Sequence, residues 1–149
     1  MMRLTRGILA TAALLALTTL TSTAYADGRD WNDGPVINAV SIRTVEGHFD
    51  DYMHWLATTY KKEQEAAKKA GIITDYRVIV LEPRGPSDPD IVLITEYKNW
   101  AARDNLRGKE DAINAQIEGS IGQVHQTEAE RAKIRTVLGS QTQQQAILK

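Results

Sequence analysis

The chain has 149 residues, of which 42% are hydrophobic and 25% are charged, a composition typical of a folded protein with room for one ordinary domain. Its 18 basic and 19 acidic residues nearly balance, which argues against a basic surface for nucleic-acid backbones. The absence of cysteine excludes disulfides, thiolate metal sites, cysteine nucleophiles and thioether-linked haem.

The first 26 residues have the three parts of a secretory signal peptide. Two arginines precede an apolar segment over residues 8–17, and the sequence AYA at residues 24–26 is a small-x-small cleavage site. The apolar segment is about half the ~20 residues that a membrane-spanning helix needs. We therefore expect cleavage after Ala26 and a periplasmic or secreted protein without a membrane anchor.

The next part of the chain predicts a leader, a strand and a long helix. Residues 27–36 are rich in turn formers and charge, which indicates an exposed leader before a folded domain over residues 37–149. Residues 38–45 alternate and are β-branched, as in a strand. Apolar residues at three- and four-residue steps then predict a helix over about 48–70, stopped by Gly71.

The lysine-rich C-terminal part of this helix is predicted to be exposed to solvent. Lysines and glutamates alternate over residues 61–69, with Glu63 and Glu65 among them. Such alternation is typical of a helix surface in water, so we expect no binding patch there.

Two further strands are predicted over residues 72–82 and 91–98, joined by a proline-rich connection over residues 83–90 that excludes a regular element. Arg77 on the first strand and Glu96 on the second are expected to form a cross-strand pair. The two strands together predict a hairpin.

The C-terminal part of the chain predicts helices and then a strand. Residues 100–138 are expected to form two or three helical pieces, because glycines interrupt helices. The candidate interruptions are Gly108, Gly119 and Gly122, with Gly139 closing the last piece. Residues 142–149 predict a fourth strand. The order is then β-α-β-β-α-β, the ferredoxin-like α+β plan, with a four-stranded antiparallel sheet and both helices on one face.

The second and third strands are apolar on both faces, although a sheet covered by helices on one side should alternate apolar and polar residues. The uncovered face carries either Val78 and Tyr97 or Ile79 and Ile94, depending on the strand register. No further element of the chain can cover this face. We therefore expect a second copy to pack against it, which makes the protein a homodimer.

Four segments carry a likeness to a known family: GHFDDYMHWL (47–56), AGIITDYRVIVLEP (70–83), DIVLITEYKNW (90–100) and IRTVLGSQTQQQAILK (134–149). They resemble the dimeric α/β-barrel superfamily, in which two ferredoxin-like subunits pack sheet against sheet, and within it small exported bacterial proteins of unknown function. The likeness covers about residues 37–149. The superfamily includes cofactor-free quinol-type monooxygenases, haem-binding and haem-degrading enzymes, isomerases and members without known activity, so the resemblance implies a fold and no single function.

One of these activities disagrees with the residues present. The haem-degrading members use an Asn, a Trp and a His, and Asn38 and Trp100 stand where the first two are expected. Glu110 stands where the His is required, which argues against haem degradation.

Four side chains are candidates for a functional site. His54 and Tyr76 are the catalytic candidates, and His54 is chosen because the charge of histidine changes near neutral pH. Trp55 and Tyr97 are the candidates for ligand binding, since aromatic rings with polar tips suit a flat aromatic ligand such as a quinol. Structural roles stay open beside these: His54 flanks the apolar stripe, and tyrosines are also common in dimer interfaces.

We expect neither a metal nor an organic cofactor. The chain has three histidines, and two of them, His48 and His54, are six residues apart and so point to different sides of one helix. The third, His125, belongs to another element, so no zinc-type ligand set is evident. The sequence also contains no nucleotide or phosphate loop, no nucleophile elbow and no H-E-x-x-H motif.

Two functions remain open at this level. The first is an exported homodimer that is non-catalytic or binds a small apolar or aromatic molecule. The second is a cofactor-free, monooxygenase-like enzyme that acts on a quinol-type or other small aromatic substrate. They differ in what they require of the interior, because an enzyme needs an enclosed cavity with polar groups of shifted pKa.

Overall fold

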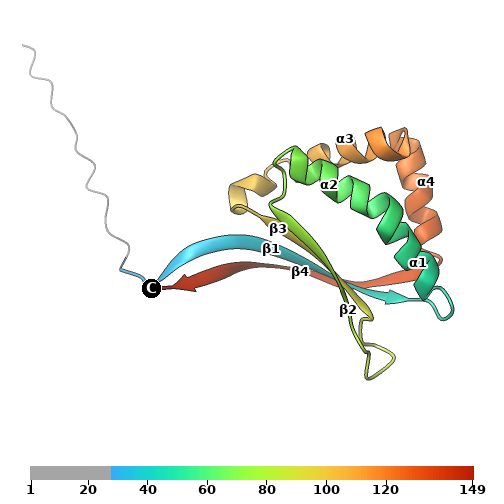
Figure 1. Cartoon of the computed structure of the whole chain (residues 1–149), viewed down its shortest axis with the longest axis horizontal. Helices are drawn as coiled ribbons and strands as arrows, with labels where there is room; N and C mark the ends of the chain where they lie inside the picture. The colour runs from blue at the N-terminus through green and yellow to red at the C-terminus, as the bar shows by residue number, and fades with distance from the viewer. Residues whose placement is uncertain (1–27) are drawn as a thin grey trace, which may run out of the picture.

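Four antiparallel strands form one sheet, and the helices lie over one of its faces (Figure 1). The computed structural model describes residues 28–149, so the predicted signal peptide and its cleavage site lie outside the described residues. The elements in chain order are β1 (Trp31–Thr44), α1 (Phe49–Trp55), the π-helical turn η1 (Leu56–Tyr60), α2 (Lys61–Lys69), β2 (Asp75–Val80), β3 (Ile91–Tyr97), the 3₁₀ turn η2 (Trp100–Arg103), α3 (Leu106–Glu118), α4 (Ile121–Arg131) and β4 (Arg135–Leu148).

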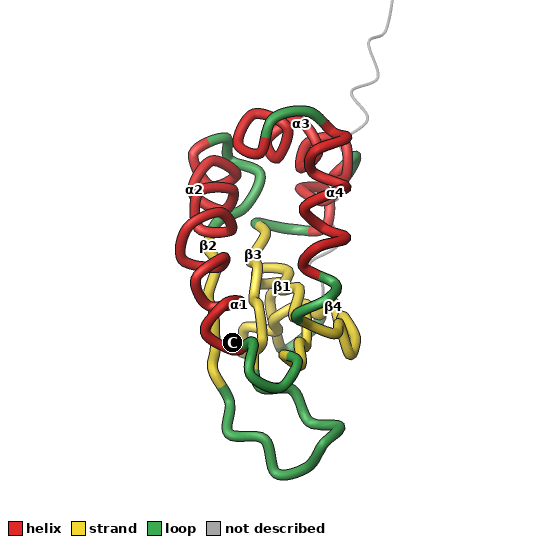
Figure 2. Tube along the Cα trace, turned by 90° about the vertical axis from the view of Figure 1, so that its right-hand side faces the viewer, coloured by secondary structure: helices red, strands yellow, loops and turns green. Residues whose placement is uncertain are grey.

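The strand order across the sheet is β2-β3-β1-β4, and every neighbouring pair is antiparallel. This sheet and its helices confirm the predicted α+β class and are compatible with the ferredoxin-like plan. The observed element order is β-α-β-β-α-α-β, because the second helical region is divided into α3 and α4. Figure 2 shows α2 and α4 flanking the view, with α3 bridging their upper ends.

The predicted long helix is confirmed as a continuous run from Phe49 to Lys69, comprising α1, η1 and α2. Acidic residues in its first turn and lysines in its last turn both interact favourably with the helix dipole. Gly71, at φ +71°, lets the chain leave the helix in a left-handed conformation. The buried side chains of this helix pack onto the sheet together with Ile42, Ile91 and Leu93.

The strand register decides which apolar residues face the helices. Val78 pairs with Leu93, and both pack in the core under the first helix, while Tyr97 is 2% exposed in a second buried cluster with Val36. Side chains alternate along a strand, so Ile79, which is 39% exposed, and Ile94 lie on the face away from the helices. Of the two sets left open by the sequence, the uncovered face carries Ile79 and Ile94.

β1 begins at Trp31, seven residues before the predicted first strand, and so takes in part of the segment predicted as a leader. Its first residues pair with the end of β4, from Trp31 opposite Leu148 onward, and remain exposed. The turn-forming Gly34-Pro35 is accommodated by a shift of register between Asp33 and Val36. Gly34 also lies so close to β4 that a Cβ there would be 2.9 Å from the backbone oxygen of Gln145.

The C-terminal boundaries differ from those predicted. The break in the helical region falls at Gly119, where φ is +109°, whereas Gly108 lies within α3 and Gly122 within α4. Gly139 was expected to close the last helix, and this prediction is wrong: α4 ends at Arg131, and Gly139 lies inside β4 opposite Ser41. Pairing with the long β1 strand accounts for the early start of β4. No helix within residues 28–149 is long and apolar enough to cross a membrane.

Candidate functional site

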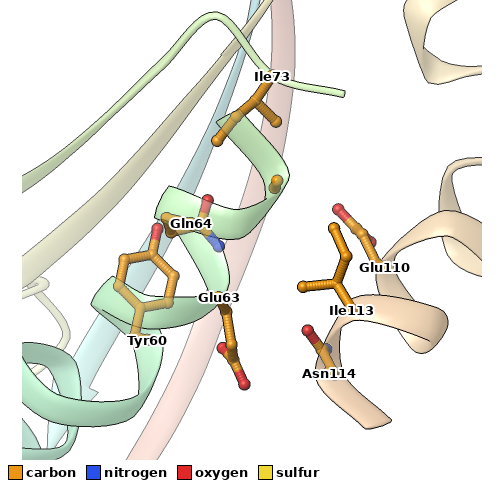
Figure 3. Close-up of a pocket in the computed structure, with 8 residues that line it drawn as sticks. Tyr60, Glu63, Gln64, Ile73, Glu110, Ile113 and Asn114 are labelled. Carbon is orange, nitrogen blue, oxygen red and sulfur yellow. The ribbon is translucent and has the colours of Figure 1, made fainter. Parts of the chain in front are cut away.

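A cavity of about 200 Å³ lies between α2 and α3 (Figure 3). Its lining residues are Tyr60, Glu63, Gln64, Ala67, Ile73, Glu110, Ile113 and Asn114. Apolar side chains form part of the wall, and carboxyl and amide groups form the rest. A buried apolar cavity of ~150 Å³ can hold one benzene molecule, so this space is of the size of a single-ring compound.

Helical spacing brings the lining residues together. Tyr60, Glu63 and Ala67 follow one another at steps of three and four on the continuous helix, so they share one face. On α3, Ile113 and Asn114 lie three and four residues after Glu110 and so share a face with it. Figure 3 shows these three side chains facing the α2 side chains across the cavity. Tyr60 ends the π-helical turn η1, a rare conformation that is frequent at functional sites.

A sharp turn separates α3, which forms one wall of the cavity, from α4. Gly119 adopts φ +109°, which a residue with a side chain rarely tolerates. Ser120 then begins α4 with a capping box, in which its side chain accepts from the Gln123 backbone N–H and the Gln123 side chain accepts from the Ser120 N–H. The glycine and the cap together fix where α3 ends.

Two wall carboxyls bind protons more tightly than usual. Glu63 is only 7% exposed, and its burial, followed by the neighbouring Glu118 carboxyl, raises the pKa of Glu63 to about 7, while Arg131 opposes this shift. Burial also raises the pKa of Glu110, with a further contribution from Asp111. A carboxyl with a pKa near neutrality in the wall of a cavity can exchange a proton at physiological pH.

A nearly buried ion pair lies next to Glu63. Arg131 Nη1 lies 3.7 Å from Glu118 Oε2, and the two side chains are 12% and 5% exposed. The Arg131 guanidinium also lies over the Trp55 ring, 4.2 Å from its centroid. Within the part of the chain that the structure describes, Trp55 Nε1 and Arg131 Nε are buried without hydrogen-bond partners. Buried polar atoms of this kind are uncommon in folded proteins.

The interpretation of residues 61–69 as a wholly solvated face is wrong at Glu63. The lysines and Glu65 are exposed, but Glu63 is buried because α3 crosses α2 at this point. A signal for this was present in the sequence: Glu63 falls in the same stripe as Leu56, Tyr60 and Ala67, at steps of four, three and four.

The structure brings two of the four candidate residues, Trp55 and Tyr76, into one row of aromatic rings, with Tyr60 between them. The Trp55 ring lies 5.8 Å from that of Tyr60, which lies 6.1 Å from that of Tyr76. The Tyr76 hydroxyl donates to Glu65 Oε1 at 2.7 Å, and burial raises the pKa of Tyr76 to about 12. Tyr60 and Tyr76 also line a second, mostly apolar cavity of about 190 Å³ beside β2.

The other two candidates lie apart from this row. His54 is exposed on α1, and among the described residues it lines neither of these cavities. Tyr97 is buried in the second cluster, with the Arg103 guanidinium 5.4 Å from its ring centroid.

Two smaller predictions from the sequence can be compared with the structure. The cross-strand pair is confirmed, with Arg77 Nη2 3.3 Å from Glu96 Oε2. Across residues 28–149 no group of three or more His, Cys, Asp or Glu side chains is arranged to hold a metal ion. That the purified protein contains neither metal nor cofactor stays a prediction.

No protein-family model matches the chain, and no curated protein matches it. HapK from Hahella chejuensis is similar in structure, with 11% identity, a TM-score of 0.49, and coverage of 74% of this chain and 91% of HapK. Protein SO0527 from Shewanella oneidensis has 15% identity, a TM-score of 0.48, and coverage of 78% and 96%. Because both TM-scores are below 0.5, the α+β assignment depends on the strand topology alone.

Proposed function

We propose that this protein is an exported, non-catalytic homodimer that binds a small molecule of about one ring in the cavity between α2 and α3. The observation that carries the proposal is the composition of the cavity wall. Ala67, Ile73 and Ile113 offer an apolar surface for a ring, while the carboxyl and amide groups offer hydrogen-bond acceptors at defined places. Small-molecule sites combine apolar lining with polar groups at fixed places, and this wall has both, although its polar share is large.

A thermal-shift screen of single-ring compounds tests ligand binding. A ligand present at 100 times its Kd stabilises the native state by about 2.7 kcal/mol, which raises the Tm by several degrees for a chain of this size. Ile113→Phe fills the cavity and should abolish the shift. Ile121→Phe is the matched control, because Ile121 is exposed on α4. If no compound shifts the Tm, or if Ile113→Phe responds like the wild type, the proposal is wrong.

The proposed dimer uses the sheet face without helices, as in the dimeric α/β-barrel superfamily. Ile79 is 39% exposed there, and its neighbours Val92 and Ile94 are half-buried in the single chain. Packing two such faces together would remove this apolar surface from water. The double variant Ile79→Asp/Ile94→Asp should sediment as a monomer, and Ala129→Asp on the exposed surface of α4 should not. A wild-type monomer at micromolar concentration would refute the dimer.

Export is proposed from the pattern of residues 1–26. Material recovered from the periplasm or medium should have Asp27 as its first residue. A different first residue, or a full-length chain retained in the membrane, would contradict this prediction.

A cofactor-free enzyme is the second candidate, and the neutral-range pKa of Glu63 favours it. A carboxylate in a ring-sized cavity can accept a phenolic proton, the first step in activating a quinol towards oxygen. Oxygen uptake with a panel of hydroquinones tests this function. The rate should rise with pH through about 7 and fall by roughly two to four decades in Glu63→Gln, but not in Glu128→Gln on the exposed surface of α4. No uptake with any hydroquinone leaves binding as the function.

A further inference from the structure

Building on the proposed binding function, we propose that the cavity selects organic cations, single-ring molecules with an ammonium group, and that each cation bound displaces the proton of Glu63 into solvent. In the exchange, the O–H bond of the Glu63 carboxylic acid breaks and the proton goes to water. The carboxylate that remains accepts hydrogen bonds from the incoming ammonium group, so the charge within the cavity region is unchanged.

The balance of charge around Glu63 carries this inference. Glu118 on α3 and Arg131 on α4 face Glu63 from the two neighbouring helices, and they already form an ion pair with each other. With Glu63 protonated, the three side chains sum to zero charge. With Glu63 ionised, one negative charge is left in a nearly buried place, and such a charge requires a partner.

None of the described residues that line the cavity can supply that partner. Among the described residues, no lysine, arginine or histidine lines the cavity, whereas a second carboxyl, Glu110, does. Arg103 offsets part of the Glu110 charge and Asp111 adds to it. The wall of the cavity therefore offers a cation two carboxyls and no basic side chain, while Arg131 and Arg103 lie beyond the wall, beside Glu63 and Glu110.

The remaining lining groups suit an ammonium ion attached to a ring. The side-chain oxygens of Gln64 and Asn114 can accept the N–H groups that Glu63 does not take. Ile73 and Ile113 contribute apolar surface for the ring. An anionic ring compound would meet the two carboxyls and be repelled, and a neutral one would leave the Glu63 proton in place.

Proton displacement makes the affinity depend on pH in a defined direction. Because burial and Glu118 hold the pKa of Glu63 at about 7, a cation that binds below that pH must displace the proton. The Kd for the cation should then rise about tenfold for each pH unit below 7, and the Kd for a neutral compound of the same shape should not change.

Calorimetric titration with benzylamine and with benzyl alcohol, from about pH 5 to about pH 8, tests the inference. Repeating each titration in buffers of different ionisation enthalpy counts the protons released. We expect benzylamine to release close to one proton per molecule bound at the acidic end and to bind more tightly as the pH rises. Benzyl alcohol should bind with a constant Kd and release no proton.

Variants assign the proton to its residue. Glu63→Gln should abolish proton release and weaken benzylamine binding at least tenfold, while leaving benzyl alcohol binding intact. Glu118→Gln frees Arg131 to neutralise Glu63, so proton release should fall while benzylamine still binds. Glu128→Gln, on the exposed surface of α4, should behave as the wild type.

The outcomes separate this inference from the function on which it rests. If both compounds bind with equal affinity at every pH, the cation selectivity is wrong and the ligand-binding function stands. If neither compound, nor any other single-ring compound, binds, both are wrong. If benzylamine releases a proton in Glu63→Gln as it does in the wild type, another group is the proton donor and the assignment fails.

Discussion

Replacing Glu63 with glutamine should change how the stability of the protein depends on pH. Glutamine keeps the shape of the side chain and removes its titration. In the wild type, burial and then the adjacent Glu118 raise the pKa of Glu63 from its ordinary value of 4.5 to about 7. The native state therefore holds this proton more tightly than the unfolded state does. Its free energy of unfolding should fall as the pH rises from 4.5 to about 7, and stay low above that.

The size of the effect follows from the interval between the two pKa values. Each unit by which the pKa of a group is higher in the native state than in the unfolded state adds about 1.4 kcal/mol to the free energy of unfolding at acidic pH. This contribution is lost as the pH rises. From 4.5 to about 7 the loss is about 3 kcal/mol. Glu63 is 7% exposed, so screening by solvent reduces this value little.

Urea unfolding at about pH 4.5 and about pH 8 measures the difference. The measured quantity is the free energy of unfolding of Glu63→Gln minus that of the wild type. This difference should be about 3 kcal/mol larger at the higher pH than at the lower one. Glu128→Gln removes a carboxyl from the exposed surface of α4 and should retain the wild-type dependence. If Glu63→Gln shows the same dependence as the wild type, Glu63 is not a buried, protonated carboxyl, and the electrostatic description of the cavity is wrong.

Two further predictions concern the elements that support the cavity. Arg131→Met should destabilise the protein by about 3–5 kcal/mol in urea unfolding, because it leaves Glu118 buried without a cation; adding Glu118→Gln should recover most of the loss, and no recovery would mean that Arg131 acts through packing alone. Gly119→Ala should cost about 1–3 kcal/mol, since φ is +109° there and the added Cβ would collide with the Gln123 side chain. Gly122→Ala, within α4, is the matched control, and equal melting temperatures for the two variants would contradict the role given to Gly119.

The parts of the fold that were predictable are those in which local pattern and tertiary packing agree. The helix from Phe49 to Lys69 has a continuous apolar stripe, charges that oppose its dipole and a terminal glycine, and its observed ends lie within a residue of those predicted. The β2 and β3 strands also follow their alternation. β1 and β4 extend beyond the prediction because their outer parts are held by pairing with each other, and Gly34 and Gly139 read locally as turn and stop signals.

The candidate site was harder to predict because it depends on a crossing of two helices. Glu110 lines the cavity because α3 packs against α2, a contact between elements that are far apart in the sequence. Glu63 lies within the apolar stripe, but the lysines around it led to the prediction that the whole segment is exposed to solvent. His54 was chosen for its chemistry, and the sequence could not show that its flank of the helix faces solvent.

The most direct test of ligand binding in the α2–α3 cavity is a crystal structure of the protein with benzylamine. We predict the ring between Ile73 and Ile113, with the ammonium nitrogen within hydrogen-bond distance of the Glu63 carboxyl. A ring bound elsewhere, or the space between α2 and α3 filled by its own side chains, would contradict the proposal.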